Sequence, residues 1–157
     1  MIALLDNTVL SNFSTVSRPD LIRLALGEAA AATQEAFAEC QTGIRLGRVP
    51  TCDWSWLPVF RLAESERETY ERLRTRLNAG EAACLAMAGA RGFRVFTDDR
   101  DARESAVQMQ VPVSGTLGLL TRLVQQAHLS LQEANDLLRR MIAAGYRSPV
   151  SDLSEIR

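Results

Sequence analysis

Residues 77–101 constrain the fold of this chain more than any other segment. Their first half, from Gly80 to Ala88, is alanine-rich and predicts a buried helix that begins near Glu81. Gly92 predicts a turn, and residues 93–97 predict a short strand. Three carboxylates follow that strand directly: Asp98, Asp99 and Asp101. Because acidic side chains at strand ends and helix starts are typical of divalent-metal sites, this segment predicts such a site as well as a helix–strand unit.

Strand-like and helix-like segments alternate along the rest of the chain. Strands are predicted at 2–5, 29–32, 93–97 and 111–113, and helices at 7–13, 17–27, 33–43, 65–77, 79–88, 101–109, 116–126 and 130–144. Residues 49–58 predict an irregular connection or edge strand with two packed tryptophans, and 149–157 a last strand or turn. The alternation favours an α/β fold with a mainly parallel central sheet. With 46% hydrophobic residues, the 157-residue chain fits one domain over 1–157.

Composition excludes several classes of site. All 18 basic residues are arginine, so a Walker A lysine and a Schiff base are excluded. The three cysteines have no CxxC spacing and His128 is the single histidine, which argues against structural zinc, a disulfide framework and HExxH catalysis. The net charge of −1 gives no global attraction for nucleic acid, so such binding requires local arginines and bound metal.

The first residues predict neither a secretory signal nor a membrane anchor. The apolar run after Met1 has no basic residue before it and stops at Asp6. No segment is apolar over the length that a bilayer requires. Together with the unpaired cysteines, this favours the reducing cytoplasm and no membrane partner.

Carboxylates occur at four places where the predicted fold would let them converge. They are Asp6 after the first strand, Glu39 on a helix, Glu81 at a helix start, and Asp98-Asp99 after the central strand. Each has a purely structural explanation as well, because acidic residues cap helices and favour helix N-termini. From the residues alone, both explanations stay open for each position.

The order of these acidic segments resembles that of PIN-domain ribonucleases, including the VapC-like toxins. The resemblance is closest to a PIN-like subfamily with a Gly-Glu-Ala motif, a Thr-Asp-Asp-x-x-Ala-Arg motif and a Gly-Thr-x-Gly-x-Leu motif. Here these stand at 80–82, 97–103 and 115–120, and the resemblance extends from Asp6 to about Tyr146. It implies a three-layer α/β/α sandwich around the mainly parallel sheet.

Carried over position by position, the resemblance implies a set of site residues. The catalytic acids would be Asp6, Glu39, Glu81 and Asp99, and the metal ligands Asp6, Glu81, Asp99 and Asp98, since either aspartate of the pair fits. Glu35 is an alternative to Glu39. Substrate contacts are expected from Thr8, Arg100 and Thr116, although Thr116 also suits a helix cap, and Arg103 is expected to neutralise nearby acids. Asn7 departs from the family, which more often has Ser or Thr there.

The implied activity is metal-dependent hydrolysis of RNA by an endoribonuclease. Clustered carboxylates either hold raised pKa values or bind a hard cation such as Mg²⁺ or Mn²⁺, which can activate water without lysine or histidine. The resemblance further implies the toxin half of a type II toxin–antitoxin pair, with a cognate antitoxin and a homodimer. The alternatives are a non-catalytic RNA- or protein-binding module, and an aspartyl phosphotransferase at Asp6, which the lack of lysine disfavours.

Overall fold

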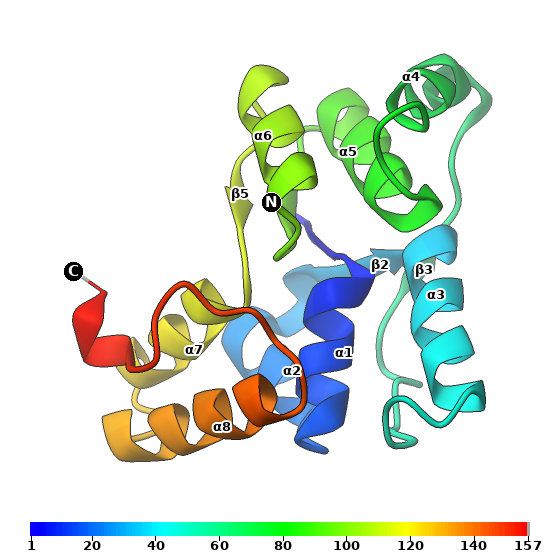
Figure 1. The fold of residues 1–157 in the computed structure, drawn as a ribbon. Helices are drawn as coiled ribbons and strands as arrows, with labels where there is room; N and C mark the ends of the chain where they lie inside the picture. Colours follow the sequence, from blue (N-terminus) through cyan, green and yellow to red (C-terminus); the bar gives the residue numbers. More distant parts are fainter. Residues whose placement is uncertain (157) are drawn as a thin grey trace.

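Five short strands form one fully parallel sheet at the centre of the molecule (Figure 1). The computed structural model describes residues 1–156. The strand order is β3-β2-β1-β4-β5, and every pairing is parallel. The strands are β1 (Ala3–Leu5), β2 (Ala30–Thr33), β3 (Val59–Phe60), β4 (Arg94–Phe96) and β5 (Val113–Ser114). The predicted α/β class with a mainly parallel sheet is therefore confirmed.

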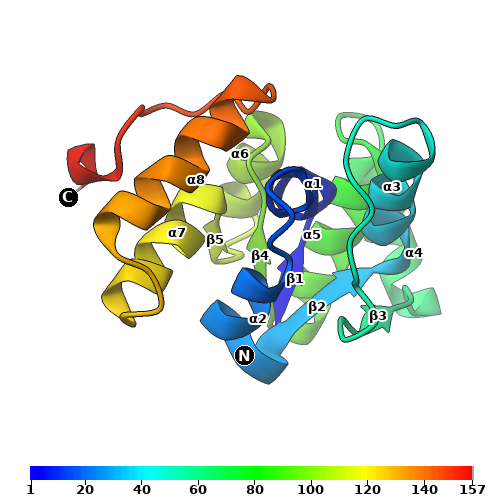
Figure 2. The same ribbon diagram turned by 90° about the horizontal axis from the view of Figure 1, so that it is seen from below.

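Helices cover both faces of this sheet, which gives three layers (Figures 1 and 2). One face carries α1 (Asn7–Thr15), α2 (Asp20–Leu26), α7 (Thr116–Gln125) and α8 (Leu131–Ala143). The other carries α4 (Arg67–Leu73), α5 (Ala79–Arg91) and α6 (Arg100–Gln108). Helix α3 (Gln34–Arg45) contributes Ala36 to one core and Cys40 to the other. Short 3₁₀ turns lie at Gly27–Ala29, Glu64–Glu66 and Leu153–Glu155.

Strand alternation explains why the central strands are apolar on both sides. Leu4 of β1 and Val95 of β4 pack against α5, whereas Leu5 and Phe96 pack against α1 and α7. Successive strand residues point to opposite faces, and both faces are covered, so no polar residue is tolerated in β1. The alanines of α5 are all buried from Ala82 to Ala88, and their small side chains let this helix lie close to the sheet.

Several boundaries differ from those that the sequence predicts. The last strand lies at Val113–Ser114 and not at 111–113, because Pro112 has no N–H to donate to a ladder. The charged helix expected over 65–77 is a 3₁₀ turn followed by α4, which ends at Leu73 before Asn78 begins a new helix. Strand β3 follows the 49–58 segment, and the C-terminal segment forms a 3₁₀ turn. Trp54 is buried against the core as expected.

No helix among residues 1–156 is both long and apolar enough to cross a membrane.

A buried ion pair ties the connection before α4 to the end of α5. The side chain of Glu66 is 2% exposed and accepts hydrogen bonds from Arg91 Nε at 2.7 Å and Arg91 Nη2 at 2.9 Å. The Ala63 N–H also donates to Glu66 Oε1 at 2.7 Å. Arg91 holds the pKa of Glu66 below its ordinary value. This pair fixes the far end of the helix whose start carries Glu81.

We expect Arg91→Ala to lower the free energy of unfolding by about 2–4 kcal/mol, because it leaves a buried carboxylate without its cation. The matched control is Asp136→Ala, which removes an ion pair with Arg139 whose two side chains are more than half exposed. That control should cost less than about 1 kcal/mol. Urea unfolding of both variants measures the difference, and equal losses would contradict this account.

Candidate active site

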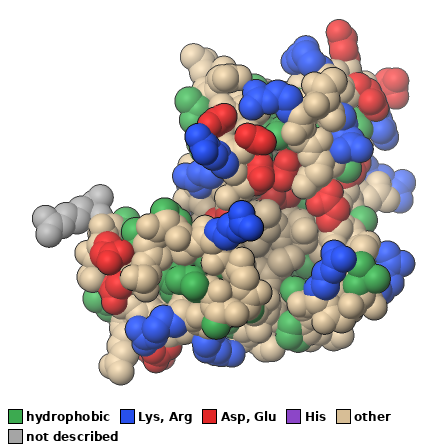
Figure 3. Space-filling view, in the orientation of Figure 1, with side chains coloured by type: hydrophobic (Ala, Val, Ile, Leu, Met, Phe, Trp, Pro, Cys, Tyr) green, Lys and Arg blue, Asp and Glu red, His purple; other side chains and the backbone are tan. Residues whose placement is uncertain are grey.

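The candidate site lies where the chain reverses its direction of strand addition. After β1 the chain builds β2 and β3 on one side, and it then returns to place β4 on the other side of β1. In open parallel sheets, ligands bind at the carboxyl ends of the strands that flank such a switch. Asp6 follows β1 and the Thr97–Asp99 segment follows β4, so the predicted acids meet at this point. Figure 3 shows acidic side chains gathered in the hollow between the upper helices and α1.

Asp6 is the most buried of these acids. Only 1% of it is exposed, and its Oδ2 accepts hydrogen bonds from Thr97 Oγ1 at 2.9 Å and Thr8 Oγ1 at 3.3 Å. Its other oxygen, Oδ1, is buried and has no hydrogen-bond partner among residues 1–156. Burial raises the pKa of Asp6 to about 6, against the hydrogen bonds, and the charge of Glu39 raises it further. A buried carboxylate oxygen without a donor is suited to a proton or a cation.

Glu81 combines a helix-capping role with closeness to the other acids. Its side chain and that of Asn78 form a capping box at the start of α5. Asn78 Nδ2 donates to Glu81 Oε1 at 3.0 Å, and the Glu81 N–H donates to Asn78 Oδ1 at 2.9 Å. Burial raises the pKa of Glu81 to about 7, and the charges of Asp6, Asp99 and Glu39 add to that rise. The four predicted catalytic acids therefore share one electrostatic environment.

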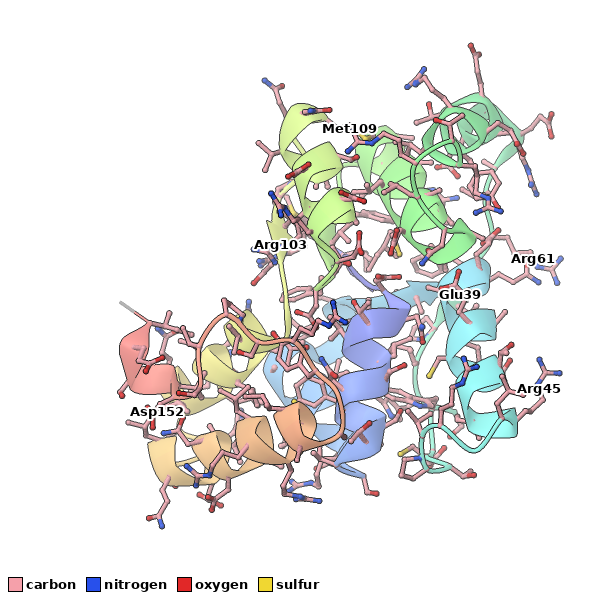
Figure 4. All side chains as sticks on the ribbon, viewed as in Figure 1. Glu39, Arg45, Arg61, Arg103, Met109 and Asp152 are labelled. Atoms are coloured by element: carbon pink, nitrogen blue, oxygen red, sulfur yellow. The ribbon has the colours of Figure 1, made fainter. Side chains whose placement is uncertain are left out.

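Glu39 joins this group because α3 and α5 approach closely. The Gly80 N–H donates to Glu39 Oε1 at 2.7 Å, and Figure 4 shows Glu39 on α3 beside the start of α5. A Cβ at Gly80 would lie 2.8 Å from Glu39 Oε2 and 3.1 Å from the Ala36 Cα. Glycine at this position thus permits the helix contact that brings Glu39 to the site. Burial raises the pKa of Glu39, although Gly80 and Arg74 oppose this.

The adjacent aspartates Asp98 and Asp99 have different surroundings. Asp98 caps α7: its Oδ1 accepts from the Thr116 N–H at 2.8 Å, and its Oδ2 accepts from Thr116 Oγ1 at 2.5 Å and Asn12 Nδ2 at 3.1 Å. Asp99 caps α6, because its Oδ2 accepts from the Ala102 N–H at 2.8 Å. The charge of Asp99 also raises the pKa of Glu81. These contacts place Asp99 with the other acids. A role for Asp98 as a metal ligand stays a prediction that its contacts do not favour.

The predicted substrate-contacting residues are placed in three ways. Thr8 donates to Asp6, and its Oγ1 accepts from the Asp98 N–H at 2.9 Å, so its hydroxyl joins the ends of β1 and β4. Thr116 is fully buried beneath Asp98. The Arg100 side chain is 90% exposed and lies near Glu104. Contacts of all three with a substrate stay predictions. Arg103, which was expected to neutralise nearby acids, donates to the Thr97 carbonyl at 3.2 Å beside Asp98.

Three polar residues of the site were given no role from the sequence. Thr97 donates to Asp6 and accepts from the Asp99 N–H at 3.2 Å, so one hydroxyl orients two acids. Asn12 supports Asp98, and Asn78 supports Glu81. The Asn-x-x-Glu spacing at 78–81 signals a cap. Nothing in the sequence indicates that Asn12 contacts Asp98, which lies 86 residues further along the chain.

The donor chemistry of the group fits a hard divalent cation. The side chains offer only carboxylate oxygens, which Mg²⁺ and Mn²⁺ prefer, and Asp6 keeps one oxygen free. Among residues 1–156, no three acidic, histidine or cysteine side chains stand close enough to enclose an ion as they are placed. Asp6 and Asp99 are nevertheless near enough to Glu81 for their charges to raise its pKa. Glu81 and these two aspartates form the candidate ligand set. They are the residues that would hold the ion.

Comparison with known proteins adds a family to this geometry. A family model described as a PIN domain matches residues 2–157. A search of curated proteins found none that matches the chain.

We expect Gly80→Ala to destabilise the protein by about 1–3 kcal/mol, because the added methyl group forces α3 and α5 apart. The control is Gly89→Ala on the same helix, where the new Cβ would meet the flexible end of Met109 at 3.2 Å. That control should be neutral or should stabilise by up to about 1 kcal/mol through helix propensity. Thermal unfolding measures both, and a harmless Gly80→Ala would show that the helices are not in tight contact.

The raised pKa values of Asp6 and Glu81 make the stability of the cation-free protein depend on pH. Asp6 and Glu81 bind protons more tightly in the folded chain than in the unfolded chain, where their pKa values are about 3.8 and 4.5. The stabilisation is complete below those values and is lost as the pH rises through about 6 and 7. With a chelator present, unfolding should need less urea at about pH 8 than at about pH 5.

Asp6→Asn removes one of the two titrations. We expect this variant to lose less stability between about pH 5 and about pH 8, by about 1.4 kcal/mol relative to the parent chain. Asp20→Asn on the surface serves as the control and should keep the parent's pH dependence. A parent protein whose stability rises over this interval would contradict the burial of the two acids.

Proposed function

The chain belongs to the PIN-domain family, and from this premise we propose that it is a metal-dependent endoribonuclease that hydrolyses RNA phosphodiester bonds. The observation that carries the proposal is Asp6, whose Oδ1 is buried without a partner among residues 1–156. The charge of Glu39 raises the pKa of Asp6, and the charges of Asp6, Asp99 and Glu39 raise the pKa of Glu81. PIN-domain membership supports nuclease chemistry in general. The metal, the RNA and the position of the cut belong to the proposal.

The proposed cofactor is Mg²⁺ or Mn²⁺, held by Asp6, Glu81 and Asp99. When bound, such an ion activates water and stabilises the negative charge that develops on the phosphate and its leaving oxygen. The protein supplies the fixed positions of the ligands. Thr97 orients Asp6 and Asp99, while Asn78 orients Glu81. These hydrogen bonds restrict the orientation of each carboxylate.

Proton handling in the proposed reaction falls to carboxylates. Glu81, whose pKa is raised to about 7 in the cation-free protein, would release its proton when the ion binds. Glu39 lies beside it, held by the Gly80 N–H, and its pKa is raised by burial. His128 lies outside this group, in the turn after α7, where it is exposed. The arrangement therefore supports metal-assisted hydrolysis that uses carboxylates and neither lysine nor histidine. This agrees with a composition that has no lysine and a single histidine.

The proposed biological role follows from the resemblance to VapC-like toxins. We propose the toxin half of a type II toxin–antitoxin pair that acts in the cytoplasm, is inhibited by a cognate antitoxin and forms a homodimer. A small open reading frame next to the gene would support this role. Its absence would weaken the role without affecting the nuclease proposal.

We expect purified protein to cut a mixed RNA pool when Mg²⁺ or Mn²⁺ is present and to stop when the ion is chelated. Asp6→Asn should reduce the rate by roughly 100-fold or more, because it removes a charged ligand of the cation. Asp53→Asn, which alters an exposed carboxylate outside the site, is the control and should keep full activity. Gel analysis of end-labelled RNA measures the rates.

Two further variants separate the adjacent aspartates. Asp99→Asn should abolish cutting with little change in melting temperature, because asparagine still accepts from the Ala102 N–H. Asp98→Asn should chiefly lower the melting temperature, because its NH2 group would replace the oxygen that accepts from Asn12 Nδ2 and Thr116 Oγ1. If a folded, antitoxin-free sample binds RNA and never cuts it with either metal, the nuclease proposal is wrong. The non-catalytic binding module would then be the better description.

A further inference from the structure

A small groove with two arginines lies beside the edge strand β5, outside the acidic site. It has a volume of about 350 Å³ and lies between β4, β5 and α7. Arg94 comes from β4 and Arg122 from α7, while Phe96, Ser114 and Gly118 form other parts of its lining. We call it the arginine groove.

The two arginines of this groove lack the partners that arginines usually have. Among residues 1–156, neither forms an ion pair with a carboxylate. Arg94 Nε is buried without a hydrogen-bond partner in the same residues, and its guanidinium carbon lies 4.8 Å from the centre of the Phe96 ring. Burial lowers the pKa of Arg94, and the charge of Arg122 lowers it further. An oxyanion bound between the two would relieve both costs.

The arginine groove adjoins a larger cavity whose wall includes Asp98. Both are lined by Ser114 and Gly118, and the larger cavity has a volume of about 680 Å³. Its wall includes Asp98, next to the catalytic candidate Asp99, and the cationic residues Arg100, Arg103 and Arg147. Figure 4 shows Arg103 on the β5 side of α6, away from Glu39. Cations thus line the cavity between Asp98 and the arginine groove.

The larger cavity has the mixed lining that suits nucleotides. Tyr146 is half-buried in its wall and offers an aromatic ring on which a base can stack. Val107, which is 69% exposed, and Leu117 add apolar surface. A volume of this size falls within the range of small-ligand sites. The charge favours a phosphate-bearing strand over an acidic protein segment, because the cations lie between the arginine groove and Asp98, the neighbour of the catalytic candidate Asp99.

We propose that Arg94 and Arg122 form a phosphate subsite for the RNA strand, and that the cavity beside Arg103 and Tyr146 holds the nucleotides between this subsite and the acids. The identity of the ligand rests on the proposed nuclease function. The subsite reads no base sequence, because it contacts only the phosphate. It fixes the register of the strand over the acidic site.

The test is the binding of a fluorescent single-stranded RNA of about twelve nucleotides with a chelator present, so that no cutting occurs. Arg94→Gln and Arg122→Gln should each weaken binding by roughly five- to tenfold, because each removes a charged donor to one phosphate. The matched control is Arg45→Gln on α3, which removes the same charge at a place remote from the groove (Figure 4). It should leave the affinity within about twofold.

The salt dependence gives a second readout. For the double variant, the slope of log affinity against log salt should become shallower by about 0.7, which is the value for one phosphate of a single strand that the protein no longer neutralises. Melting temperatures exclude unfolding as the cause, and Arg122→Gln keeps the test open if Arg94→Gln folds poorly. Variants that bind RNA as tightly as the Arg45→Gln control would overturn the subsite.

Two competition experiments identify the ligand. If inorganic phosphate or a polyglutamate peptide occupies the groove while RNA affinity is unchanged by the arginine substitutions, the RNA subsite is wrong.

Cleavage assays are run in parallel. Cutting by a parent protein whose arginine variants bind normally overturns the subsite and leaves the nuclease intact. Loss of binding in the variants of a protein that never cuts supports the subsite and overturns the nuclease.

Discussion

The close burial of several carboxylates at the ends of β1 and β4 is the constraint on which this structure depends. Asp6 is almost completely buried, and its carboxylate accepts hydrogen bonds from the hydroxyls of Thr97 and Thr8, with a further contribution from the Asn7 backbone. Like charges in a poorly solvated place repel, which is why the pKa values of Asp6 and Glu81 rise. Perturbed pKa values of this kind cluster at functional sites, so the group favours a function that uses it.

Helix capping holds these acids without a separate scaffold. Glu81 accepts from Asn78 at the start of α5, Asp99 accepts from the Ala102 N–H at the start of α6, and Asp98 accepts from Thr116 at the start of α7. Each helix start lies at the same edge of the parallel sheet, so local capping bonds also fix the relative positions of the carboxylates. The structural and functional explanations of these residues are therefore compatible.

Much of the fold was predictable because local patterns carry it. The buried strands at β1 and β4, the alanine-rich α5 and the Ser130 capping box all follow from short-range sequence signals. Predictions failed where a boundary depends on a distant partner: β3 forms only because β2 accepts Val59 and Phe60 beside it. The start of β5 is likewise set by its pairing with Val95 and Phe96.

For the site, the order of residues was enough to identify Asp6, Glu39, Glu81 and the Asp98-Asp99 pair as candidates, because strand ends and helix starts are local features. It placed Asp99 among the catalytic acids and left Asp98 as an alternative metal ligand. Folding separates them, since Asp98 meets Thr116 and Asn12 from distant helices while Asp99 stays with the acids. The sequence likewise does not show that Arg94 and Arg122 line the same groove. Such contacts arise from the packing of α7 against the sheet, which no short sequence window contains.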